Sequence, residues 1–124
     1  MIQIKTCPLV EIHHKKSNRA YAHWGHKSNV ICVSRAIYKL PLSHSIAILA
    51  HEVGHALVKG GMEEKANEAA KKAFGTTIIY LPHTPWGTRL EYIPYTKLNR
   101  VYGILKSYVD QSSLKAFQPL QSTS

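Results

Sequence analysis

The segment His51-Glu52-Val53-Gly54-His55 holds the side chains of this sequence that are best suited to chemistry. With about 3.6 residues per turn of an α-helix, His51 and His55 project from one face, so both imidazoles can reach the same metal ion. Glu52 is rotated by about 100° from His51, which puts its carboxylate beside such an ion, where it can take a proton from a metal-bound water. The spacing therefore predicts a zinc ion held by His51 and His55, with Glu52 as the general base.

Apolar residues surround this motif, from Ile46 to Ala50 before it and from Ala56 to Val58 after it. Burying two imidazoles and a carboxylate among them is costly unless a partner such as a metal ion compensates. The alternative interpretation is that the three polar side chains are ordinary surface or half-buried groups on a helix. The apolar surroundings favour the metal site over this alternative.

A catalytic zinc ion usually has three protein ligands, so a third ligand must come from elsewhere in the chain. No histidine lies three or six residues after His55, because these positions are Val58 and Gly61. The downstream carboxylates are Glu63, Glu64, Glu68, Glu91 and Asp110. The Gly60-Gly61 pair predicts a chain reversal that lays the first turn of a second helix against the first helix. Glu63 and Glu64 are therefore the nearest candidates.

Glu63 is the preferred third ligand, because Asn67 lies four residues later on the same helix face and can support a ligand through its amide. Glu64 and Glu68 fit a solvated face that pairs with neighbouring lysines, although Glu64 stays an alternative ligand. His83 is a further alternative, since it is the only later histidine and lies in a proline-rich loop that can sit over the site.

The length and the residue pattern predict one α+β domain around this motif. The chain has 124 residues, of which 44% are hydrophobic, as is typical of one small globular domain. Strands are predicted at residues 2–4, 9–12, 20–24, 30–34, 76–81 and 89–93, and helices at 42–59, 62–74 and 96–110. Glycines at 60, 61 and 75 are expected to end the first two helices. We expect a single domain over residues 1–110 and a flexible tail over 111–124.

The stretch HEVGHAL followed by EEKANEAA resembles the gluzincin pattern HExxH…ExxA(D/N). Residues 29–34, leading through residues 40–43 into the helix, are similar to minimal metallopeptidases of the ImmA/IrrE type, with some similarity to SprT-like proteins. The resemblance covers residues 20–81. It implies a zincin-like fold with a small N-terminal sheet, an active-site helix, a second helix that bears a glutamate, and a C-terminal helix.

The same resemblance implies that His51, His55 and Glu63 bind zinc, that Glu52 is the general base, and that Asn67 orients a ligand histidine. This sequence departs from the family pattern in two respects. Glu63 follows His55 unusually closely, and SprT-like proteins take a later histidine as the third ligand. The expected activity is hydrolysis of a peptide bond in a specific protein substrate, with one zinc ion per chain. Four side chains are candidates for stabilising the oxyanion: Tyr80, His83, Tyr92 and Tyr95.

The charge of +9, from 16 basic and 7 acidic residues, favours acidic partners such as nucleic acid. The basic residues are spread along the chain, so a solvated surface explains the charge as well as a binding groove does. The alternative to an enzyme is a non-hydrolytic zinc-containing regulatory module that binds nucleic acid or a partner protein through its basic surface. No apolar run is long enough to insert into a membrane, and the start lacks a signal peptide, so we expect a cytoplasmic protein. Cys7 and Cys32 are expected to be reduced thiols. The oligomeric state stays open.

Overall fold

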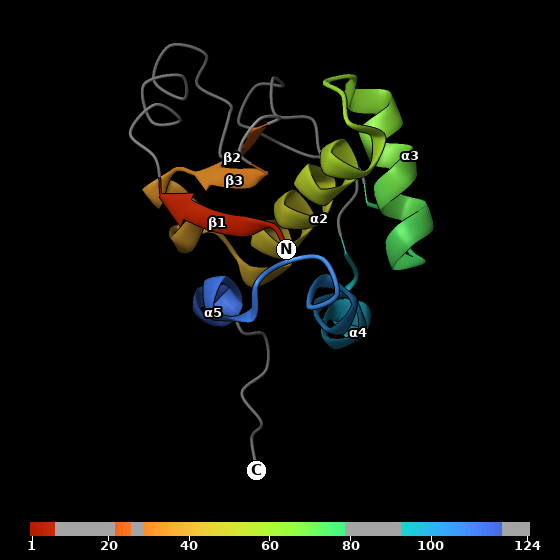
Figure 1. Ribbon diagram of the computed structural model, residues 1–124. Coiled ribbons are helices and arrows are strands. Elements are labelled where there is room, and N and C mark those ends of the chain that lie inside the picture. Colours follow the sequence, from red (N-terminus) through yellow and green to blue (C-terminus); the bar gives the residue numbers. More distant parts are fainter. Residues whose placement is uncertain (7–21, 26–28, 79–92, 118–124) are drawn as a thin grey trace.

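A computed structural model describes residues 1–6, 22–25, 29–78 and 93–117 of the chain (Figure 1). This part of the protein is α+β, with a three-stranded sheet on one side of a central helix and a second helix on the other. The strands are β1 (Gln3–Thr6), β2 (Ala22–Gly25) and β3 (Val30–Val33). The helices are α2 (Leu42–Val58), α3 (Glu63–Phe74), α4 (Leu98–Leu105) and α5 (Gln111–Leu114), with 3-10 turns η1 (Arg35–Lys39), η3 (Tyr95–Lys97) and η4 (Lys115–Phe117).

The middle strand of the sheet is β3. It pairs antiparallel with β2, as predicted from the two apolar runs, and parallel with β1. Within β3 the side chains of Ile31 and Val33 are fully buried, whereas those of Val30 and Cys32 are only partly buried. This alternation is what a strand with one face on the core requires.

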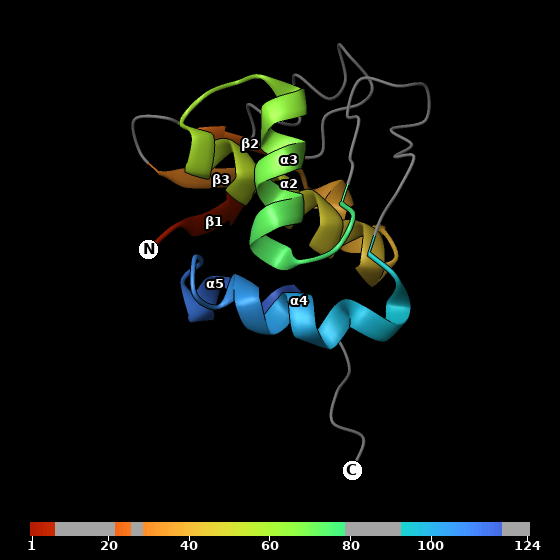
Figure 2. The same cartoon turned by 90° about the vertical axis from the view of Figure 1, so that its right-hand side faces the viewer.

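The central element is α2, whose bounds agree closely with the predicted helix at 42–59. Every residue from Ser45 to His55 is buried, because the sheet packs against one side of α2 and α3 against another, while α4 and α5 lie below (Figure 1, Figure 2). A helix that is covered on all sides has an almost continuously apolar sequence, as residues 46–50 do. The three polar residues of the motif therefore lie in the interior of the domain.

The turn between α2 and α3 differs from the predicted glycine stop in one respect. The left-handed residue that ends α2 is Lys59, with a φ of 52°, and its N–H donates to the carbonyl oxygen of His55. The N–H of Gly60 donates to the same oxygen over 3.3 Å. Gly75 ends α3 in the left-handed conformation, with a φ of 71°, as predicted.

The predicted flexible tail over 111–124 is wrong for residues 111–117. These residues form α5 and η4, and they bury Leu114 and Phe117 in the core. The Asp110 side chain caps α5 by accepting a hydrogen bond from the N–H of Ser113, whose hydroxyl in turn accepts from the N–H of Ile4. The domain thus continues to Phe117 and closes on β1, while residues 118–124 lie outside the described part.

Three further predictions need correction. The helix predicted at 96–110 is shorter, since α4 ends at Leu105 and a turn follows. Residues 76–78 form no strand, and the rest of that predicted strand lies outside the described residues, as do 9–12 and nearly all of 89–93. Cys32 is disulfide-bonded, contrary to the expected reduced thiol, and Cys7 lies outside the described residues. None of the described helices combines the length and apolar character needed to cross a membrane.

Candidate metal centre

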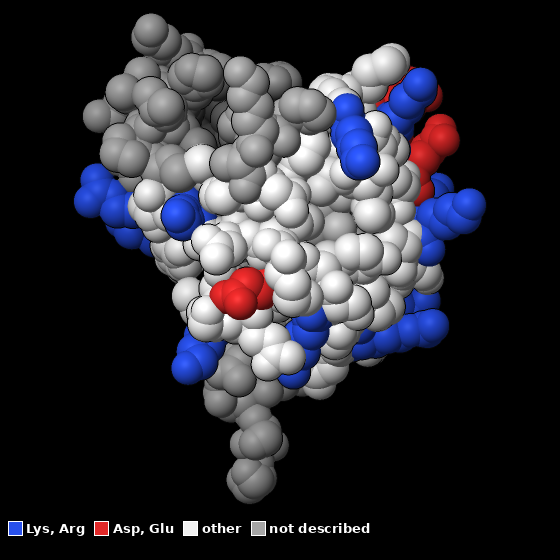
Figure 3. Space-filling view, viewed as in Figure 1, with Lys and Arg blue, Asp and Glu red and all other residues white. Residues whose placement is uncertain are grey.

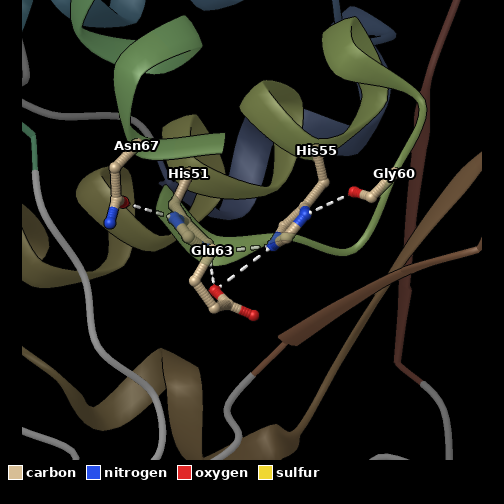
Figure 4. Close-up of polar contacts among 5 residues, drawn as sticks. All are labelled: His51, His55, Gly60, Glu63 and Asn67. Carbon is tan, nitrogen blue, oxygen red and sulfur yellow. Dashed lines mark hydrogen bonds and ion pairs between the residues drawn. The ribbon is translucent and has the colours of Figure 1, made fainter. Parts of the chain in front are cut away.

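Four polar side chains and one backbone carbonyl meet where α2 and α3 cross (Figure 4). His51 and His55 come from α2, Glu63 and Asn67 from the first turns of α3, and the carbonyl from Gly60 in the turn between them. Oε1 of Glu63 lies 2.7 Å from Nε2 of His51 and 3.4 Å from Nε2 of His55. The chain reversal after α2 therefore brings the preferred carboxylate against both imidazoles.

The crossing is close because residue 54 has no side chain. A Cβ atom at Gly54 would lie 2.2 Å from the carbonyl oxygen of Ala66, far inside van der Waals contact. Ala66 is itself fully buried and small. Only a glycine at this point of α2 lets the backbone of α3 approach so closely.

The other nitrogen of each imidazole is held by an oxygen acceptor. Nδ1 of His51 lies 2.8 Å from Oδ1 of Asn67, and Nδ1 of His55 lies 2.8 Å from the carbonyl oxygen of Gly60. Since both oxygens accept, each Nδ1 carries a hydrogen and donates it. In a neutral imidazole this leaves Nε2 with a free lone pair, which is the form that binds a metal ion.

Three lone-pair atoms consequently face one another: two Nε2 atoms 3.1 Å apart and the Glu63 oxygen. Such an arrangement requires a positive charge among them, either a proton or a metal ion. Ligands at about 2.05 Å from a tetrahedral zinc ion lie about 3.3 Å from each other. The separation of the two Nε2 atoms and the distance from His55 to Glu63 fit that geometry closely. The distance of 2.7 Å from His51 to Glu63 is shorter, so the carboxylate would have to move slightly away from His51.

Glu52 lies beside this cluster. The residue is buried, with 4% of its surface exposed, and one of its carboxylate oxygens lies within 4.8 Å of a ring nitrogen of both His51 and His55. His51, Glu52 and His55 together form a group that could hold a metal ion. The Glu52 carboxylate therefore lies beside the imidazole nitrogens of both histidines.

The electrostatics of the site favour a positive charge between the imidazoles and the carboxylate. Burial alone would lower the pKa of His55, but its hydrogen bond to Glu63, the charge of Glu52 and the Gly60 carbonyl outweigh burial and raise this pKa to about 9. Burial likewise opposes the charge of Glu63, yet hydrogen bonds from His51 and His55 lower the pKa of Glu63 to about 2. A divalent cation would replace the proton that these groups otherwise share.

Of the remaining candidates from the sequence, only Glu64 and Glu68 have described side chains, and both lie away from the cluster. Glu64 and Glu68 are exposed on the outer face of α3. Tyr80, His83 and Tyr92 lie outside the described residues, and Tyr95 begins η3 with a side chain that is also outside them. The described residues therefore bring together His51, Glu52, His55, Glu63 and Asn67.

Two contributors were missed in the sequence. The Gly60 carbonyl could not be anticipated, because it depends on the conformation of the turn. Gly54 did carry a signal, since a glycine in the interior of a predicted helix often marks a close approach of another backbone.

No family model, no curated protein and no solved structure matches the chain.

Proposed function

We propose that this protein is a zinc-dependent metallopeptidase with a zincin-like fold, in which His51, His55 and Glu63 hold the metal ion. One observation carries the proposal: two imidazole nitrogens and a carboxylate oxygen converge within 3.4 Å while both opposite ring nitrogens are bound by oxygen acceptors. Ring nitrogens fixed in this way are typical of metal ligands, because the outer hydrogen bonds set the tautomer and the ring orientation.

The chemistry of the donor set supports zinc over harder cations. Two imidazole nitrogens and one carboxylate oxygen are a common ligand set of catalytic zinc, whereas calcium and magnesium prefer sites made of oxygen atoms. Three protein ligands leave one coordination position for water or substrate. The side chain of Glu63 is 38% exposed, so the cluster is accessible from that side.

A zinc ion bound here would acidify a water molecule and polarise a substrate carbonyl. Glu52 lies beside the cluster and would accept a proton from that water and return it to the leaving amine. Burial keeps the Glu52 carboxylate from being fully solvated, and the helix α2 fixes it relative to both histidines. The resemblance to gluzincins supports a peptide bond in a protein as the substrate.

The surface charge gives less support to a nucleic-acid-binding module. On the face shown in Figure 3, lysine and arginine side chains are separated by uncharged surface, and acidic side chains lie among them beside α3. The exposed face of α3 mixes both signs, with Glu64, Glu68, Lys65, Lys71 and Lys72. The described residues form no continuous basic surface on this face, as binding to a phosphate backbone would require.

The test of this function is hydrolysis by the zinc-loaded protein of a proteome-derived peptide library, with new termini identified by mass spectrometry. The wild type should produce a reproducible cleavage pattern. Glu52→Gln should keep one zinc ion and cut the same peptides about 100-fold or more slowly, because a general base typically contributes that much. Glu64→Gln, a matched change on the exposed face of α3, should cleave like the wild type. Cleavage by Glu52→Gln at the wild-type rate, or no cleavage by the zinc-loaded wild type, would contradict the proposal.

A further inference from the structure

We infer that Gly54 is a positioning residue of the metal centre, which sets the spacing between α2 and α3 so that Glu63 can join the two histidines. The inference rests on the proposed metal site. It assigns to Gly54 a role in metal binding that is separate from the stability of the fold.

The contact at Gly54 allows no local adjustment. A Cβ atom there would meet only backbone atoms of Ala66, namely the carbonyl oxygen at 2.2 Å, the carbonyl carbon at 3.0 Å and the Cα atom at 3.3 Å. Backbone atoms cannot rotate away as a flexible side chain can. To reach ordinary contact, the separation from the oxygen must grow from 2.2 Å to at least 3.4 Å, and α3 must move as a unit.

The displaced segment carries the groups that the site needs. Ala66 lies three residues after Glu63 and directly before Asn67 on α3. The contacts that cross the helix pair are short, at 2.7 Å from Glu63 to His51 and 2.8 Å from Asn67 to His51. Because metal–ligand distances tolerate only about 0.2 Å of variation, a shift of this size would detach the carboxylate or turn the ring.

Helix stability by itself would favour alanine at this position, since glycine weakens a helix interior. The chain offers a matched comparison in Gly103, which lies in α4 at an exposed position and whose added Cβ would meet nothing within 4 Å. Alanine at position 103 is therefore expected to stabilise its helix and leave zinc binding unchanged, whereas alanine at position 54 is expected to push α3 away from α2 and weaken zinc binding.

The experiment uses the full chain and three variants: Gly54→Ala, Gly103→Ala and Ala70→Gly. Ala70 is fully buried on α3, so its replacement by glycine weakens that helix without pushing it from α2. Zinc affinity is measured by competition with a chromophoric chelator, cobalt coordination by the visible absorption of the Co²⁺-loaded protein, and folding by circular dichroism and thermal unfolding.

Gly54→Ala is expected to stay folded, to bind zinc at least 10-fold more weakly, and to lose intensity in its cobalt spectrum. Gly103→Ala should bind as the wild type does, and Ala70→Gly should unfold at a lower temperature with unchanged affinity. If Gly54→Ala alone does not fold, the same readings are taken in the Gly103→Ala background with a stabilising osmolyte.

Wild-type affinity and spectrum in folded Gly54→Ala would overturn the inference and leave the proposed metal site standing. So would an affinity loss in Ala70→Gly equal to that in Gly54→Ala, since this would make the effect one of helix stability. A wild type that binds no metal ion would overturn both the site and the role of Gly54.

Discussion

The imidazole rings of His51 and His55 stand nearly perpendicular, at 89° with centroids 4.6 Å apart, and their Nε2 atoms approach to 3.1 Å. Successive turns of α2 alone bring the two rings to the same face. Their convergence on one point depends in addition on α3 and on the turn, which hold the outer nitrogen of each ring. The site is therefore a property of the α2–α3 hairpin rather than of one helix.

Asn67→Ala should weaken zinc binding by about 10- to 100-fold, because it removes the acceptor that fixes the His51 ring. Asn67→Asp keeps an oxygen at this position and should restore most of the affinity. Chelator competition at fixed pH measures both values. Equal zinc affinity in Asn67→Ala and the wild type would show that the hydrogen bond does not orient the ligand.

The metal-free protein should be most stable between about pH 4.5 and 6.5. The folded-state pKa of His55, about 9, lies above its ordinary value of 6.5, so the stability that its charge contributes is complete below pH 6.5 and is lost as the pH rises through 9. The folded-state pKa of Glu63, about 2, lies below its ordinary value of 4.5, so its contribution is present above pH 4.5 and is lost as the pH falls through 2.

Urea titrations from about pH 2 to above pH 9, with a chelator present, measure how the free energy of unfolding depends on pH. Adding zinc should remove the alkaline loss of stability, because the metal ion takes the place of the proton between His55 and Glu63. A metal-free stability that stays constant from pH 6.5 to above pH 9 would contradict the assigned ion pair.

Phe117→Ala should lower the free energy of unfolding by about 3–5 kcal/mol, as expected for loss of a fully buried aromatic ring. The Phe117 side chain is 1% exposed, and its ring stacks on Tyr38 with centroids 5.1 Å apart. Lys115→Ala, two residues earlier and exposed, should change the stability by less than about 0.5 kcal/mol. Chemical denaturation compares the two variants; a Phe117→Ala protein as stable as the wild type would mean that residues 111–117 do not pack on the domain.

The sequence was sufficient for the parts of the site that follow from helical spacing. The common face of His51 and His55 depends only on the helical repeat, and the nearness of Glu63 depends on the chain reversal after α2. The bounds of α2 followed from a periodic apolar pattern, and those of α3 from a run of good helix formers that ends at Gly75.

The parts that were not predicted depend on contacts between distant residues. The pairing of β1 with β3 joins residues that are far apart in the sequence, so the local pattern does not specify it. Leu114 and Phe117 stand in a short Ser- and Gln-rich segment whose helical turns are too brief to show a period. The left-handed Lys59 took the place expected for glycine, and its N–H and that of Gly60 both donate to the carbonyl oxygen of His55.

The most direct test of the central claim is the zinc content of untagged protein after equilibrium dialysis, measured by elemental mass spectrometry for the wild type, Glu63→Gln and Glu64→Gln. We expect one zinc ion per chain in the wild type and in Glu64→Gln, and a large loss in Glu63→Gln, since Glu63 contacts both histidines whereas Glu64 is exposed on the outer face of α3. A folded wild type without zinc, or a Glu63→Gln variant that retains the full amount, would contradict the metal centre described above.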